Sequence, residues 1–92
     1  MPKHLMIEGR VQGVGYRASF AAQARVLGLA GWVRNRRNGA VEACVSGSAP
    51  AEEAIIVWAH QGPPSAQVRQ VQVKDADPAS VVDGPFAILP TV

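Results

Sequence analysis

The stretch that most constrains the fold of this chain is EGRVQGVGYR, which runs from Glu8 to Arg17. An alternating apolar segment, typical of a strand, precedes it, and an alanine-rich segment, typical of a helix, follows it. Three glycines stand where the two meet: Gly9, Gly13 and Gly15. Glycine adopts backbone angles that side chains forbid and lets the backbone approach a ligand closely. We therefore expect a strand that turns through glycines into a helix.

Such a turn is a suitable place for an anion, above all a phosphate. The first N–H groups of a helix have no partner within the helix, and its dipole adds positive potential there. Arg17 follows at once, with a planar group of donors that matches phosphate oxygens. The alternative is a glycine-rich turn beside a surface arginine. The candidate phosphate-binding residues are Gly13, Val14, Gly15, Tyr16 and Arg17.

The formal net charge of +2 conceals a strong asymmetry along the chain. The segment 10–37 contains six arginines and no Asp or Glu, whereas the rest holds three basic residues and all seven acidic ones. A positive field around the glycine stretch would steer an anionic ligand inward. A solvated basic face is the alternative interpretation.

Size and composition predict one small globular domain spanning residues 1–92. The hydrophobic share is 48% and the charged share 17%, which argues against disorder. We find no signal-peptide pattern and no window long enough for a membrane helix. A single cysteine, Cys44, excludes an internal disulfide and fits a reducing compartment. We expect a cytoplasmic protein with no membrane partner, and a monomer because no surplus apolar stripe is present.

The apolar patterns predict strands at residues 3–9, 30–35, 40–46, 70–74 and 86–89. A first helix, with Phe20, Ala24 and Leu27 on its apolar face, should end at Gly28. Asn38-Gly39 should form a hairpin turn. Ser48 should cap a second helix, which ends at Gly62-Pro63-Pro64.

Side-chain alternation assigns the faces of these elements. Within the third strand, Val41, Ala43 and Val45 should face the core, with Cys44 half-buried on the opposite face. The second helix should bury a stripe that Ile56 and Val57 widen, so that it is deeply packed. Its central members are Ala51, Ile55, Trp58 and Ala59.

The order β-α-β-β-α-β with a short extra strand predicts an α+β fold of two layers. It is the ferredoxin-like, split βαβ arrangement, with a mostly antiparallel sheet and both helices on one face. Many unrelated activities share this fold, so it does not by itself indicate a function.

Two motifs resemble those of the acylphosphatase family: GRVQGVGYR at residues 9–17, and GWVRN at residues 31–35 with Gly39 after it. The predicted elements follow the family order over nearly the whole chain. The resemblance implies that the chain hydrolyses acyl phosphates to a carboxylate and inorganic phosphate. It implies that Arg17 and Asn35 are catalytic, the first by holding the phosphoryl group with the glycine loop and the second by positioning water.

The rest of the sequence is compatible with this chemistry. His4 and His60 lack ligand spacing relative to Cys44, so we expect no metal. The loop lacks a Gly-Lys-Ser/Thr ending, so magnesium, ATP or another cofactor is not implied. The leaving group of an acyl phosphate is a carboxylate that needs no proton, so the reaction demands mainly positioning and charge stabilisation. Without the resemblance, Asn35 would be interpreted as a residue that starts the turn.

Two residues depart from the family pattern. Arg36 stands where threonine is common, and either adds positive charge at the mouth of the site or points to solvent. Gly15 stands where a larger apolar residue is common, which predicts a more flexible loop.

Two functions of other classes stay open. Ferredoxin-like sheets can bind RNA through exposed aromatic side chains, and Tyr16 and Trp32 lie near arginines. The same loop could also form an enzymatically silent anion-binding module. No RNP-type segment is present, so we expect a small-molecule acyl phosphate as partner and no nucleic acid.

Overall fold

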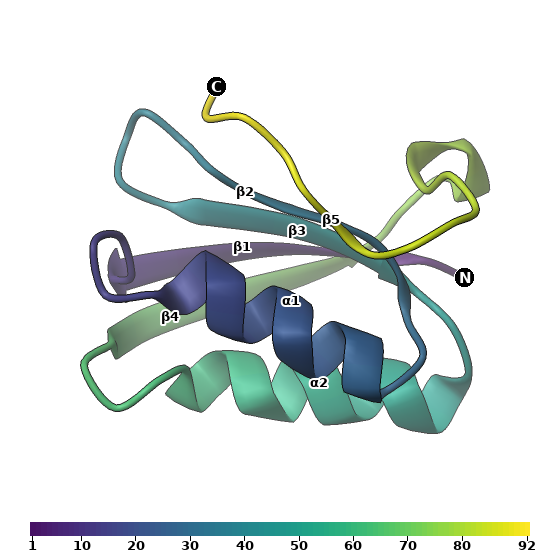
Figure 1. Cartoon of the computed structure of the whole chain (residues 1–92), viewed down its shortest axis with the longest axis horizontal. Helices are drawn as coiled ribbons and strands as arrows, with labels where there is room; N and C mark the ends of the chain where they lie inside the picture. Colours follow the sequence, from purple (N-terminus) through teal and green to yellow (C-terminus); the bar gives the residue numbers. More distant parts are fainter.

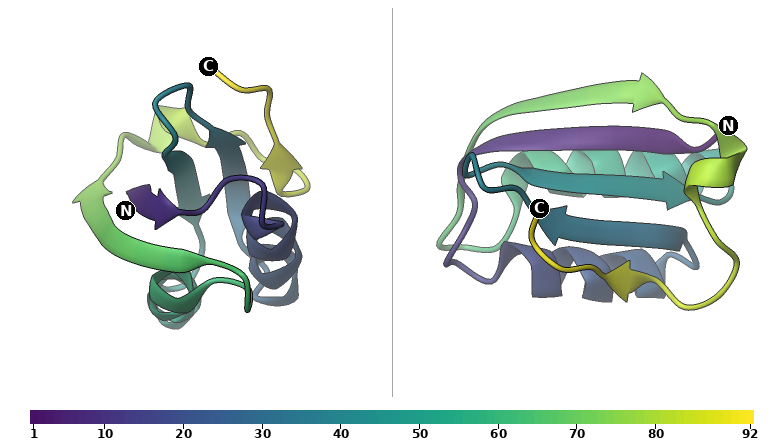
Figure 2. Two further views of the ribbon diagram at one scale, coloured as in Figure 1. Left: turned by 90° about the vertical axis from the view of Figure 1, so that its left-hand side faces the viewer. Right: turned by 90° about the horizontal axis from the view of Figure 1, so that it is seen from above.

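Two helices pack on one face of a five-stranded sheet in the computed structural model, which describes all 92 residues (Figures 1 and 2). The sheet order is β4-β1-β3-β2-β5, and every pairing is antiparallel except the parallel pair β2–β5. This arrangement confirms the predicted α+β, ferredoxin-like fold. The elements are β1 (Lys3–Arg10), α1 (Tyr16–Val26), β2 (Ala30–Asn35), β3 (Val41–Ser46), α2 (Ala49–Gln61), β4 (Gln67–Asp75), the 3₁₀ helix η1 (Pro78–Ser80) and β5 (Ala87–Ile88).

The predicted ends of both helices are confirmed. At the end of α1, Gly28 has a φ of 72° and the Leu29 N–H donates to the Ala24 carbonyl, which buries Leu29 against the helix. Ser48 caps α2, because its hydroxyl accepts from the Ala51 N–H at 3.3 Å. These local signals depend only on neighbouring residues, which is why the sequence predicts them well.

The core lies between the helices and the sheet. The predicted inward faces are confirmed, since Val41, Ala43 and Val45 of β3 are fully buried. Aromatic rings fill the layer beneath the helices, and the ring centre of Phe20 lies 5.8 Å from that of Phe86 and 5.7 Å from that of Trp58. This packing fixes α1, α2 and the C-terminal segment relative to one another.

Strand β4 is longer than predicted, because Val68 lies within it. A bulge shifts the register of the β1–β4 pair: Glu8 pairs with Gln70, but Gly9 pairs with Val68. The extra residue, Arg69, displaces Val68 from the simple alternation, and Val68 still packs against the core. A side chain at Gly9 would lie 2.2 Å from the Gln67 carbonyl oxygen, so the close approach of the strands there requires glycine.

Two burial predictions are wrong. Val57 does not widen the apolar stripe of α2 but is 61% exposed, because it lies on the side of the helix away from Ile55 and Ala59. Cys44 is fully buried rather than half-buried. Its partners across the sheet are His4 on β1 and Trp32 on β2, and these large side chains cover it. Burial raises the pKa of the Cys44 thiol.

Candidate active site

The loop between β1 and α1 adopts the left-handed conformation that its glycines were expected to provide. Gly13 has a φ of 74° and Gly15 a φ of 80°. A side chain at either position would meet no atom within 4 Å, so the backbone angle and not lack of space requires glycine. The loop and the β2–β3 hairpin lie at the same end of the molecule (Figures 1 and 2).

Helix α1 begins at this loop with its N–H groups available to a ligand. Gly15 is the residue before the first turn and offers no side chain to cap it, and no acidic residue lies in that turn. The first hydrogen bond within the helix runs from the Ser19 N–H to the Gly15 carbonyl, at 3.1 Å. The preceding N–H groups therefore add to the positive end of the helix dipole. This end of α1 suits an anion.

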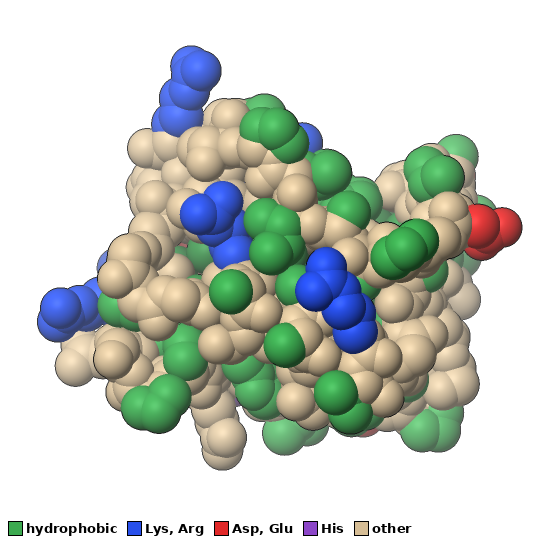
Figure 3. All heavy atoms as spheres, viewed as in Figure 1, with side chains coloured by type: hydrophobic (Ala, Val, Ile, Leu, Met, Phe, Trp, Pro, Cys, Tyr) green, Lys and Arg blue, Asp and Glu red, His purple; other side chains and the backbone are tan.

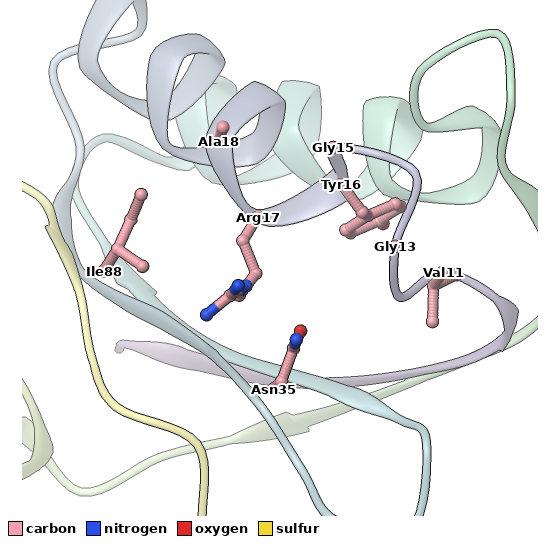
Figure 4. Close-up of a pocket in the computed structure, with 8 residues that line it drawn as sticks. All are labelled: Val11, Gly13, Gly15, Tyr16, Arg17, Ala18, Asn35 and Ile88. Carbon is pink, nitrogen blue, oxygen red and sulfur yellow. The ribbon is translucent and has the colours of Figure 1, made fainter.

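A pocket of about 180 Å³ opens beside the loop. Arg17 reaches it from α1 and Asn35 from the end of β2, and the two side chains point toward each other in Figure 4. The fold thus brings together the two residues that were predicted from separate motifs. The lining residues are Val11, Gly13, Gly15, Tyr16, Arg17, Ala18, Asn35 and Ile88.

Two predicted loop residues have different surroundings. Val14 does not line the pocket; it packs partly buried against the core. Tyr16 borders the pocket, but its side chain is only 1% exposed, and its hydroxyl donates to the Ala59 carbonyl of α2 at 2.7 Å. Burial raises the pKa of Tyr16 far above its usual value, so its hydroxyl stays a donor. Tyr16 therefore anchors α1 on α2.

The amide of Asn35 has an unusual environment. Its Oδ1 atom is buried and has no hydrogen-bond partner. A buried acceptor without a partner lowers the stability of the folded state by about 1–3 kcal/mol. Such groups therefore usually mark a bound water or a functional contact. In the turn that follows, the stabilising side chain belongs to Asn38, whose Oδ1 accepts from the Ala40 N–H at 3.0 Å. The Asn35 oxygen therefore takes no part in the hydrogen bonds of the turn, and Asn35 lines the pocket.

Gln12 is a residue of the site that the sequence analysis missed. Its Nε2 donates to the Arg36 carbonyl at 2.7 Å and to the Ala40 carbonyl at 2.9 Å. The side chain therefore ties the glycine loop to the hairpin that begins after Asn35. Its position inside the glycine stretch was the only signal in the sequence.

Arg36 makes a contact that the sequence did not predict. Its Nη1 lies 3.2 Å from Oε1 of Glu42, which also accepts from the Arg34 Nε at 2.8 Å. The other carboxylate oxygen of Glu42 is 2.7 Å from the His4 Nε2. Burial opposes ionisation of Glu42, but the hydrogen bonds from His4, Arg34 and Arg36 outweigh it and lower its pKa. Arg36 thus belongs to a cluster on the outer face of the sheet.

The two aromatic residues that favoured RNA binding are engaged elsewhere. Tyr16 is buried on the helix side of the sheet. Trp32 donates from Nε1 to the Ser80 carbonyl at 2.9 Å, and the Arg34 guanidinium lies 4.7 Å from its ring centre. Tyr16 therefore offers no surface on which a base could stack, and Trp32 is partly buried by its contacts within the chain.

A family model for acylphosphatase matches residues 3–88. The chain belongs to the acylphosphatase family.

Relatives from the same family match most of the length of this chain. It is 56% identical over 88 residues to an acylphosphatase from Azoarcus sp. (strain BH72), covering 95% of this chain and 87% of that one. It is 58% identical over 74 residues to an acylphosphatase from Acidovorax sp. (strain JS42), covering 80% and 76%. A solved structure of an acylphosphatase from Coxiella burnetii has a TM-score of 0.87 at 32% identity, covering 96% of this chain and 90% of that one. Family and fold together identify a hydrolase that acts on acyl phosphates.

Two further features of this chain concern metals and membranes. No three or more His, Cys, Asp and Glu side chains gather where they could hold a metal ion. Neither helix has the length and apolar character needed to cross a bilayer.

Proposed function

We propose that Arg17 and the backbone N–H groups of residues 13–17 hold the phosphoryl group of an acyl phosphate while Asn35 orients the attacking water. The observation that carries the proposal is the buried, unpartnered Oδ1 of Asn35, in the same pocket as the Arg17 side chain. The guanidinium provides charge-assisted hydrogen bonds to phosphoryl oxygens. The helix end and the loop provide neutral donors.

The reaction needs no group that this pocket lacks. The Asn35 oxygen accepts one hydrogen bond from water, which directs a lone pair of the water oxygen toward phosphorus. The new bond joins that oxygen to phosphorus, and the bond between phosphorus and the acyl oxygen breaks in line with it. The electron pair leaves with the carboxylate, and both protons of the water stay on the phosphate product. No general base or acid is required, because the carboxylate departs without a proton.

Hydrolysis of benzoyl phosphate by the purified chain, in EDTA, tests this function. We expect turnover that is insensitive to EDTA and inhibited competitively by inorganic phosphate. Binding of phosphate without turnover would favour the silent anion-binding module. Activity that EDTA abolishes and magnesium or zinc restores would contradict the mechanism.

We also propose that residues 1–92 act as a single monomeric domain in the cytoplasm, with a small-molecule acyl phosphate as the partner. One contiguous hydrophobic cluster joins both helices to the sheet, which supports a single domain. The lone, buried Cys44 fits a reducing compartment. Sedimentation equilibrium at micromolar concentration should give the mass of one chain.

A further inference from the structure

The pocket beside the glycine loop has two chemically different ends. Near the loop it offers backbone N–H groups and Arg17, which suit the phosphoryl group. Beyond Arg17 it is lined by the apolar side chains of Ala18 on α1 and Ile88 on β5. Figure 4 shows Arg17 and Asn35 between Ile88 on one side and Gly13 on the other. The mechanism proposed above uses nothing at the apolar end.

Ile88 is a large apolar side chain that the fold leaves uncovered. It is 44% exposed, although it lies in a strand. On the face of the molecule that carries α1 and β5, apolar and basic side chains lie interspersed, and acidic ones are seen toward the margin (Figure 3). An apolar group that covered Ile88 would remove part of its surface from water, which is favourable.

The position of Ile88 is rigid. Ile88 pairs with Val33 in the parallel β2–β5 ladder, and the Leu89 N–H donates to the Val33 carbonyl at 2.9 Å. On the other side, Nη2 of Arg25 on α1 donates to the Phe86 carbonyl at 2.8 Å. The strand is therefore held by both β2 and α1, and a rigid element can discriminate between ligands.

We propose that Ile88, with Ala18, forms an acyl-binding subsite that selects uncharged, apolar acyl groups. This inference rests on the proposed function and names the substrate class of the same site. The subsite binds the acyl group outside the reacting bonds, so it contributes to substrate affinity more than to the chemical step. Such uniform binding changes KM and leaves kcat nearly constant.

The test compares benzoyl phosphate with acetyl phosphate as substrates of the parent, Ile88→Ala and Ile88→Leu. We expect Ile88→Ala to lower the ratio of kcat/KM for benzoyl over acetyl phosphate by about three- to tenfold, mainly through KM. The inhibition constant of inorganic phosphate should not change, because phosphate has no acyl group. Ile88→Leu should retain most of the discrimination. The matched control is Val57→Ala, which removes an exposed apolar side chain on α2, outside the pocket.

Each outcome has a definite meaning. An unchanged benzoyl to acetyl ratio in Ile88→Ala, or an equal loss with both substrates, would overturn the acyl subsite and leave the proposed function intact. A parent protein that hydrolyses neither compound would overturn the proposed function and the subsite with it. A lower ratio with constant phosphate inhibition, absent from Val57→Ala, would support the subsite.

Discussion

Replacing Gln12 by alanine tests whether the link between the glycine loop and the β2–β3 hairpin matters for both stability and binding. The variant loses two hydrogen bonds, of 2.7 and 2.9 Å, to the Arg36 and Ala40 carbonyls. Both carbonyls keep a second partner: Arg36 O accepts from the Gly39 N–H, and Ala40 O accepts from the Arg36 N–H. Neither carbonyl becomes a buried acceptor without a partner, so the free energy of unfolding should fall by only roughly 1–2 kcal/mol.

For a domain of this size, that loss corresponds to a fall in Tm of about 4–16 °C. Freed from the hairpin, the loop should also hold phosphate less well, so the inhibition constant of inorganic phosphate should rise about three- to tenfold. Gln12→Glu should be worse, because a carboxylate cannot donate to the carbonyls and repels the anion. Thermal melts and phosphate inhibition measure both effects. Gln61→Ala, at an exposed position ending α2, is the control.

A Gln12→Ala variant with the stability and phosphate affinity of the parent would refute this reasoning. Loss of stability alone would mean that the two hydrogen bonds support the fold and do not organise the loop for an anion.

Two further predictions concern charged residues. Arg17→Lys keeps the charge but loses the planar pair of donors, so the inhibition constant of inorganic phosphate should rise about tenfold or more and kcat should fall. An inhibition constant equal to the parent's would mean that Arg17 is only part of a general basic field. Because the folded-state pKa of Glu42 is lowered, its contribution to stability is present above its unfolded pKa, about 4.5, and is lost as the pH falls through the lower folded value. Glu42→Gln should therefore lower the free energy of unfolding by roughly 2 kcal/mol at pH 7 and flatten its dependence on pH below about 4.5. An equally steep pH dependence in the variant would contradict the contribution assigned to ionised Glu42.

The fold was predictable from the sequence wherever the signal is local. Glycines at the start of α1, Gly28 at its end, Ser48 before α2 and the Asn38-Gly39 turn each act through neighbouring residues. The β-bulge opposite Gly9 could not be foreseen, because it depends on which strand pairs with β1.

Burial was less predictable for the same reason. The environment of Cys44 is set by Trp32 and His4, which come from other strands. Arg36 is drawn to Glu42, six positions further along the chain, only because β2 and β3 pair in this register.

The site was predictable in its residues but not in its geometry. The pattern around Arg17 indicates an anion site, whereas Asn35 by itself has the appearance of a turn residue, and the family resemblance was needed to single it out. That the two line one pocket depends on the packing of α1 beside β2. The hydrogen bonds of Gln12 require the same tertiary approach, which no short sequence motif shows.

The most direct test of the central claim is to measure kcat and the phosphate inhibition constant of Asn35→Ala on the same preparation. Loss of one well-placed polar contact in a preorganised site commonly reduces kcat by about 10²–10³, so we expect that loss with phosphate inhibition within about twofold of the parent's. The Tm should not fall, because the Oδ1 atom has no hydrogen bond to lose and its removal relieves an unsatisfied buried acceptor. Asn35→Asp should also be slow, since a carboxylate beside the phosphoryl group repels it. A destabilised Asn35→Ala protein with full kcat per folded molecule would contradict the assignment of Asn35 to the attacking water.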